Sequence, residues 1–242
     1  MDIKRTVYVL PNLFTTANLF CGVYAIISTL SGQFFHSAIA ILIANIFDIA
    51  DGKVARITNT TSKFGIEYDS LCDLVSFGVA PALLIYNWGL KEFGRIGWMA
   101  SFLFIACGAL RLARFNVMIE ITEKSRFLGL PIPAAASTIA GTYLFFKKIG
   151  LMMIEKNFAL LFLTYGLSFL MVSNIRYLSF KELGFLKKRP LTYLFILILL
   201  FMLIASKPNI MIFFFLIIYV ISGPAEFVYT KIFRRGKVWL KK

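Results

Sequence analysis

Residues 48–73 read DIADGKVARITNTTSKFGIEYDSLCD and place four aspartates inside a strongly apolar sequence. Asp48 and Asp51 lie three positions apart, and Asp69 and Asp73 lie four apart, so in two helices each pair shares one helix face. An ionisable side chain at membrane depth costs at least about 2.5–3.5 kcal/mol on insertion scales. Four of them in neighbouring segments therefore need a compensating cation, and a purely structural role is disfavoured.

Two such faces packed together would form a cage of carboxylate oxygens. Mg²⁺ and Mn²⁺ prefer oxygen ligands and commonly share them with substrate phosphates. We therefore predict that Mg²⁺ or Mn²⁺ is held by Asp48, Asp51, Asp69 and Asp73. Between the pairs, Gly52 and Gly65 allow a ligand to approach the backbone closely, and Arg56 is a fixed cation suited to phosphate. Membrane aspartates also serve ion or proton transport, so a transporter is an alternative at this point.

The composition predicts an all-α protein that crosses the membrane several times. Hydrophobic residues make up 59% of the 242, and the mean hydropathy is +0.80. Segments long enough to span a bilayer, about 17–25 residues, occur at 13–31, 35–56, 62–87, 95–117, 131–149, 157–175, 189–205 and 208–231. We expect a polytopic bundle of about eight transmembrane helices, forming a single domain over residues 1–242.

The same pattern divides this domain into three parts. Residues 1–12 are expected to form a short interfacial helix, residues 13–175 a six-helix catalytic core, and residues 189–231 two additional helices. Within the third span, Gly78 and Pro81 can open or kink the helix just after the aspartates.

The positive charge of the chain, formally +14, is unevenly distributed. If both termini lie on one side of the membrane, the opposite side receives only six of the 26 basic residues, namely Lys91, Arg95, Lys147, Lys148, Lys156 and Lys207. The positive-inside rule then places both termini and the aspartates at the cytoplasmic face of the cell membrane. Nucleic acid is not an expected partner, because no soluble segment is large enough to carry such a site.

The aspartate stretch resembles the signature of the CDP-alcohol phosphatidyltransferases, integral membrane enzymes that move a phosphatidyl group from a CDP-linked lipid to an alcohol. It matches D-x-x-D-G-x-x-A-R-x8-G-x-x-x-D-x-x-x-D at every fixed position. Aspartate-rich prenyltransferases share D-x-x-D but lack the Gly, Ala-Arg and Gly at these offsets. The strings PNLFTTANLFCG, DSLCDLVSFGVAP, RLARFN and FLGLPIPAAA, which begin at residues 11, 69, 111 and 127, are similar to the phosphatidylserine synthase branch of the family.

The resemblance implies transfer of the phosphatidyl group of CDP-diacylglycerol, or of an archaeal CDP-lipid, to the hydroxyl of L-serine, with release of CMP. Glycerol phosphate and inositol phosphate are alternative acceptors, and an ion-coupled transporter is the alternative from another class. Asp48, Asp51 and Asp69 would hold one metal ion. Asp73 would help hold a second ion and, as the last aspartate of the signature, is the candidate general base. A homodimer is common in the family and is expected on that ground alone.

The resemblance also implies the residues that contact the two substrates, the CDP-lipid and L-serine, within the surrounding membrane lipids. The nucleotide would be bound by Gly52, Ala55, Arg56, Gly65, Asn12, Thr15 and Asn18. The polar residues at the start of the first span also have a simpler interpretation, which is hydrogen bonding to the helix backbone. The acceptor or a phosphate would be bound by Arg111, Arg114, Asn116 and Ser76. Both arginines are also explained as anchors at the cytoplasmic end of their helix.

Overall fold

The computed structural model describes residues 3–58, 62–121, 128–151, 157–175, 177, 202 and 206–238. Most of them lie in helices, which confirms the all-helical prediction for the described residues. The predicted span at 189–205 falls almost wholly outside them, as does the basic loop before it. Among the described residues, four helical stretches are long and apolar enough to cross a membrane: Pro11–Leu30, Lys63–Phe93, Arg95–Met118 and Pro208–Thr230. An integral membrane protein is therefore supported, whereas a count of eight spans is not confirmed.

The first helix, α1 (Ile3–Leu30), is continuous through Pro11. Residues 3–12 are therefore part of α1 and not a separate helix, whereas the interfacial position of this stretch stays a prediction. Just after Pro11, Thr16 Oγ1 donates to the Asn12 carbonyl at 2.7 Å, a common local bond of helical hydroxyl side chains.

A tight turn joins α1 to α2 (Phe34–Ile57), so the two helices form an antiparallel hairpin. The Gln33 N–H donates to the Ser28 carbonyl at 2.8 Å, and Gly32 takes the left-handed conformation that the turn requires, with φ of 73°. The buried face between the helices is rich in small side chains, including Ala25, Ala38 and Ala44. Small residues let the two backbones approach closely.

The third span is built from five consecutive helical segments: α3 (Lys63–Asp73), η1 (Leu74–Val79), α4 (Ala80–Ile85), η2 (Tyr86–Leu90) and η3 (Lys91–Phe93). Ser62 caps its start by accepting a hydrogen bond from the Gly65 N–H at 3.0 Å. The segments η1 and η2 are π-helical, with a wider turn than an α-helix. Because Pro81 has no N–H to donate to the preceding turn, the chain widens next to it, directly after Asp73.

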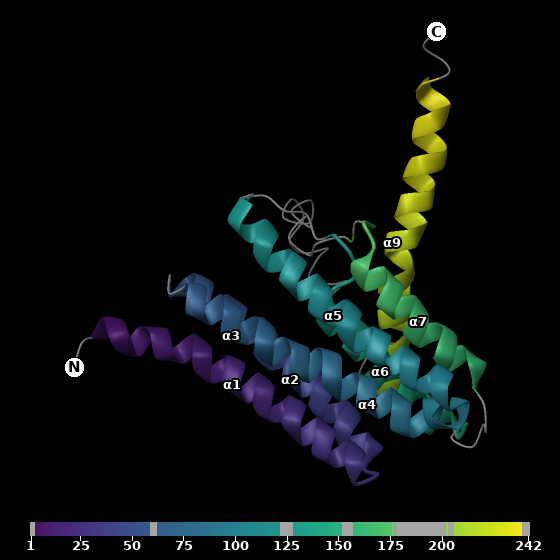
Figure 1. The fold of residues 1–242 in the computed structure, drawn as a ribbon, viewed down its shortest axis with the longest axis horizontal. Coiled ribbons are helices and arrows are strands. Elements are labelled where there is room, and N and C mark those ends of the chain that lie inside the picture. Colours follow the sequence, from purple (N-terminus) through teal and green to yellow (C-terminus); the bar gives the residue numbers. More distant parts are fainter. Residues whose placement is uncertain are drawn as a thin grey trace.

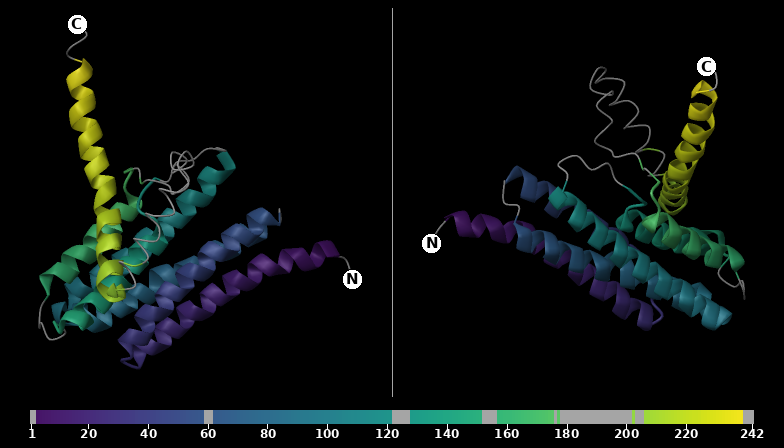
Figure 2. Two further views of the ribbon diagram at one scale, coloured as in Figure 1. Left: turned by 180° about the vertical axis from the view of Figure 1, so that it is seen from behind. Right: turned by 45° about the horizontal axis from the view of Figure 1, so that its top comes forward.

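The remaining described helices are α5 (Arg95–Ile121), α6 (Ile132–Ile149), α7 (Phe158–Val172) and α9 (Pro208–Val238). The middle of α6 is buried on nearly all sides, from Ala135 to Leu144. Helix α9 packs on α6 through stacked rings of Phe145 and Phe213, whose centroids are 4.3 Å apart. It crosses the other helices steeply, and its C-terminal part extends away from them (Figures 1 and 2).

One end of the bundle collects the helix termini that border the aspartate stretch. The start of α1, the end of α2, the start of α3 and the end of α5 lie at this end (Figure 1). The antiparallel connections between these helices require this arrangement. The second half of α2 and the first half of α3 therefore lie at the same end of the bundle, and both helices pack against α1.

Candidate functional site

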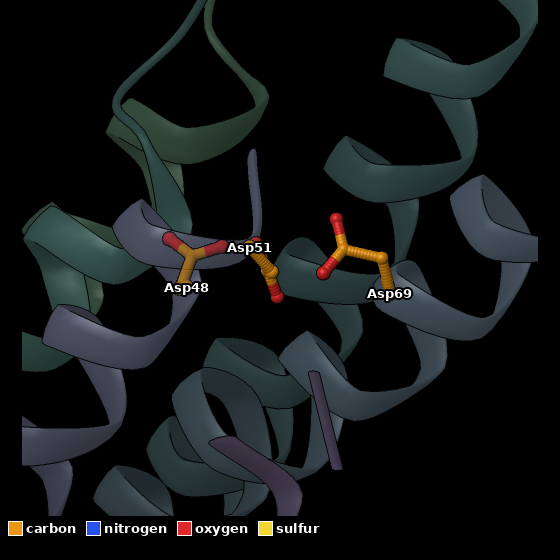
Figure 3. A group of neighbouring side chains, drawn as sticks. All are labelled: Asp48, Asp51 and Asp69. Carbon is orange, nitrogen blue, oxygen red and sulfur yellow. The ribbon is translucent and has the colours of Figure 1, made fainter. Parts of the chain in front are cut away.

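The site is formed where α2 and α3 face each other. Asp48 and Asp51 project from α2, and Asp69 projects from α3 toward them (Figure 3). One carboxylate oxygen from each of the three lies within 4.8 Å of the others. Asp51 is only 4% exposed, and Asp48 and Asp69 are half-buried. The structure thus brings together three of the four predicted aspartates.

These three carboxylates suit a divalent cation. Oxygen ligands lie about 2.0–2.1 Å from Mg²⁺, so two ligands of one ion are at most about 4.2 Å apart. The three oxygens lie within 4.8 Å of one another, so small side-chain movements would bring them onto one ion. Asp69 Oδ1 is buried and has no hydrogen-bond partner among the described residues, which leaves it available to a ligand. A buried carboxylate oxygen without a partner destabilises a fold unless something else binds it.

Asp73 lies one turn further along α3 and is not part of this group of three. It is 7% exposed and accepts a hydrogen bond from Asn18 Nδ2 at 2.9 Å. Asp73 therefore lies beside the group of three without being a member of it. Its place in a second metal site stays a prediction.

Helix α1 contributes one hydrogen-bond donor to the group of three aspartates and another to Asp73. Thr15 Oγ1 donates to Asp51 Oδ2 at 2.9 Å, three residues before the Asn18 that donates to Asp73. Both donors were predicted to contact the nucleotide, and the structure places them on carboxylates. The sequence contained a signal for this arrangement, because T-x-x-N puts the two side chains on one helix face.

The other residues predicted to bind the nucleotide lie at the same end of the bundle. A Cβ atom added to Gly52 would meet only Arg56 Nη2 within 4 Å, at 3.7 Å. Arg56 is exposed and donates from Nε to the Gly52 carbonyl at 2.7 Å. A Cβ on Gly65 would lie 3.6 Å from Asn12 Oδ1, so Asn12 of α1 is next to the start of α3. Ala55 is half-buried on α2.

The predicted acceptor-binding residues are not all free. Ser76 Oγ donates to the Asn18 carbonyl at 3.0 Å, and Arg114 Nη1 donates to the Val172 carbonyl at 3.3 Å. Arg111 is 8% exposed, and its Nε has no hydrogen-bond partner among the described residues. A buried guanidinium nitrogen without an acceptor is suited to an anion. Of this set, Arg111 keeps the clearest capacity to bind a ligand.

Asn116 joins α5 to α3 through side-chain hydrogen bonds. Its Nδ2 donates to Ser70 Oγ at 3.0 Å and to Glu67 Oε2 at 3.3 Å. Glu67 is exposed, in agreement with the sequence pattern, which puts it on a different face from Asp69. These contacts hold α5 against the helix that carries Asp69 and Asp73.

Comparison with known proteins identifies relatives over most of the chain. The profile of a family described as CDP-alcohol phosphatidyltransferase matches residues 8–170. A Helicobacter pylori protein named CDP-diacylglycerol–serine O-phosphatidyltransferase is 42% identical over 228 residues, which cover 93% of each chain. A Bacillus subtilis protein of the same name is 38% identical over 72% of this chain and 92% of its own. An archaetidylserine synthase from Methanothermobacter thermautotrophicus is 38% identical over 73% of this chain and 72% of its own.

Proposed function

The chain belongs to the CDP-alcohol phosphatidyltransferase family, and we propose that it transfers the phosphatidyl group of CDP-diacylglycerol, or of an archaeal CDP-lipid, to the hydroxyl of L-serine. The observation that carries this proposal is the 42% identity, over 93% of the chain, to a relative named for this reaction. The similarity to an archaetidylserine synthase supports the same acceptor on a different lipid. The protein is accordingly a membrane-bound transferase of phospholipid biosynthesis.

Asp48, Asp51 and Asp69 would hold a divalent cation, either Mg²⁺ or Mn²⁺. The oxygen spacing and the unpartnered Asp69 Oδ1 support this assignment. When bound, the ion would neutralise negative charge on the diphosphate and on the departing CMP. Helix α1 packs against both α2 and α3, and Asn116 of α5 holds α3 through its side-chain hydrogen bonds. These contacts keep the three side chains in position.

Asp73 is the candidate general base. A serine hydroxyl is a poor nucleophile at neutral pH, so a carboxylate must take its proton as its oxygen attacks the lipid phosphorus. In this step the new P–O bond to serine forms, the P–O bond to CMP breaks, and the proton passes to Asp73. The position of Asp73 beside the group of three, with its own donor from Asn18, supports this division of roles.

The remaining residues complete the proposed substrate sites. Gly52 leaves room for the nucleotide next to α2, Gly65 would contact it at the start of α3, and Arg56 is exposed where a phosphate would arrive. The unpartnered Nε of Arg111 supports its binding to the serine carboxylate or to the lipid phosphate. The active site and both termini would face the cytoplasm, in keeping with the positive-inside rule, and the enzyme would act as a homodimer.

The test is an assay on the purified full-length protein in detergent. It is supplied with CDP-diacylglycerol, labelled L-serine and Mg²⁺ or Mn²⁺, and both CMP and labelled lipid are measured. We expect both products in equal amounts, and Asp73→Asn should abolish turnover while CDP-lipid binding persists. Product with glycerol phosphate or inositol phosphate, but not with serine, would refute the acceptor. Ion flux across vesicles without CMP would indicate a transporter, and release of inorganic diphosphate would indicate a prenyltransferase.

A further inference from the structure

Two buried side chains on one face of α1 each donate to a different carboxylate of the site. Thr15 is 4% exposed and donates to Asp51 at 2.9 Å. Asn18 is fully buried and donates to Asp73 at 2.9 Å. Charge-assisted hydrogen bonds of this kind are short and directional, so each donor restrains the carboxylate that it contacts.

The two carboxylates belong to different parts of the site. Asp51 is one of the three aspartates whose oxygens lie within 4.8 Å of one another, whereas Asp73 is outside that group. A donor on Asp51 therefore restrains a member of the metal-binding group. A donor on Asp73 restrains the candidate base without contacting that group.

Close packing fixes the position of α1 against the segment that carries Asp73. Ser76 Oγ donates to the Asn18 carbonyl at 3.0 Å, which ties the backbone of α1 to η1. One turn further along α1, a Cβ added to Gly22 would lie 2.7 Å from Ser76 Cα. The Asn18 amide therefore has little freedom to move relative to Asp73.

Stability alone does not explain an amide at position 18. Asn18 Oδ1 is buried without a hydrogen-bond partner among the described residues, and such an atom lowers stability. The benefit that remains is the bond from Nδ2 to Asp73. This pattern indicates a residue that serves the site rather than the packing of the helix.

We propose that α1 divides the four aspartates between two tasks, with Thr15 positioning Asp51 for the divalent cation and Asn18 positioning Asp73 for the acceptor hydroxyl. The inference rests on the proposed function and deepens it. Neither side chain is a catalytic residue in this scheme, because each acts through a carboxylate. Partners of this kind typically change metal affinity or activity by about 10–100-fold when they are removed.

Thr15→Val tests the first half, because it removes the hydroxyl and nearly preserves the shape. Binding of Mn²⁺ is measured by electron paramagnetic resonance on the full-length protein in detergent, without substrate. We expect an affinity about 10–100-fold weaker than in the wild type, with recovery in Thr15→Ser, which keeps the hydroxyl. The matched control is Thr29→Val, another buried α1 threonine that donates to α2, through Ser37 at 2.7 Å. Unchanged Mn²⁺ affinity in Thr15→Val would overturn this half.

Asn18→Leu tests the second half, and the smaller Asn18→Ala is made in parallel in case leucine does not fit. We expect kcat at saturating metal to fall by about 10–100-fold, while the Mn²⁺ affinity of the site formed by Asp48, Asp51 and Asp69 stays within about twofold of the wild type. Retained Mn²⁺ binding also shows that the variant is folded. Asn87→Leu is the control, since Asn87 Nδ2 donates only to the Leu83 carbonyl at 3.0 Å within its own span.

The pair of variants gives a decisive pattern. Loss of Mn²⁺ affinity in Asn18→Leu equal to that in Thr15→Val would overturn the division of tasks, as would an unchanged kcat in Asn18→Leu. A wild-type protein that binds Mn²⁺ but releases no CMP with serine would instead refute the proposed function. The Mn²⁺ measurements need no substrate, so the two failures are distinguishable.

Discussion

Replacement of Gly22 by alanine should separate α1 from η1 and disturb the site without touching any carboxylate. The new Cβ would lie 2.7 Å from Ser76 Cα, a backbone atom that cannot rotate away. Overpacking of this kind costs about 1–3 kcal/mol. For a chain of this size each kcal/mol lowers Tm by about 2–4 °C, so we expect Tm to fall by about 2–12 °C.

Activity should fall as well, because the displaced helix carries Asn18. A shift of about 1 Å in a catalytic group costs on the order of 10²-fold in rate. CMP release is therefore measured well below the Tm of the variant, where the protein is folded. We expect a loss of about tenfold or more under these conditions, with a larger loss for Gly22→Val.

Gly166→Ala is the matched control for this experiment. Gly166 lies inside the apolar helix α7, but an added Cβ would meet no atom of the described residues within 4 Å. Alanine is favoured over glycine in a helix by about 0.5–1 kcal/mol, so Tm should stay constant or rise slightly. If Gly22→Ala has the Tm and the activity of the wild type, the close approach of α1 to η1 is refuted.

Three further outcomes test other parts of the structure. Chelation with EDTA should abolish CMP release and re-addition of Mg²⁺ or Mn²⁺ should restore it; activity that survives exhaustive chelation would exclude a metal-dependent enzyme. Asp69→Asn should weaken Mn²⁺ binding at least about tenfold, because Asp69 is the only α3 contribution to the group of three, and unaltered binding would remove it from the ligand set. Ser62→Ala should lower the free energy of unfolding by about 0.5–2 kcal/mol through loss of the α3 cap, measured as a lower Tm.

Much of the helical framework could be predicted from the sequence because apolar runs and their breaks are strong local signals. The predicted span 35–56 corresponds to α2 at Phe34–Ile57, and 131–149 corresponds to α6 at Ile132–Ile149. The prediction of a separate helix over residues 1–12 failed, because α1 runs unbroken through Pro11. Neighbouring helices can stabilise a helix around a proline, and that packing is not visible in the local sequence.

The acidic group was predictable for a similar reason. The spacing within residues 48–73 fixes which aspartates share a helix face, and a short connection requires the two helices to be neighbours. The spacing of Thr15 and Asn18 puts them on one face of α1, but it does not predict which aspartates they contact. Thr15 meets Asp51 across 36 residues and Asn18 meets Asp73 across 55, so these pairs depend on how α1 lies against the other two helices.

The widened helix after Asp73 gives this arrangement a physical basis. Gly78 and Pro81 predicted an opened helix, and the structure places the π-helical η1 between Asp73 and α4. A wider turn shifts the residues that follow it relative to α-helical register, which brings Ser76 under the Asn18 carbonyl. The segment η1 therefore carries the Ser76 contact that fixes α1, and it begins directly after Asp73, which accepts a hydrogen bond from Asn18. A change in helix geometry at Leu74–Val79 should consequently alter Asp73 more than Asp48 or Asp51, since those two project from α2.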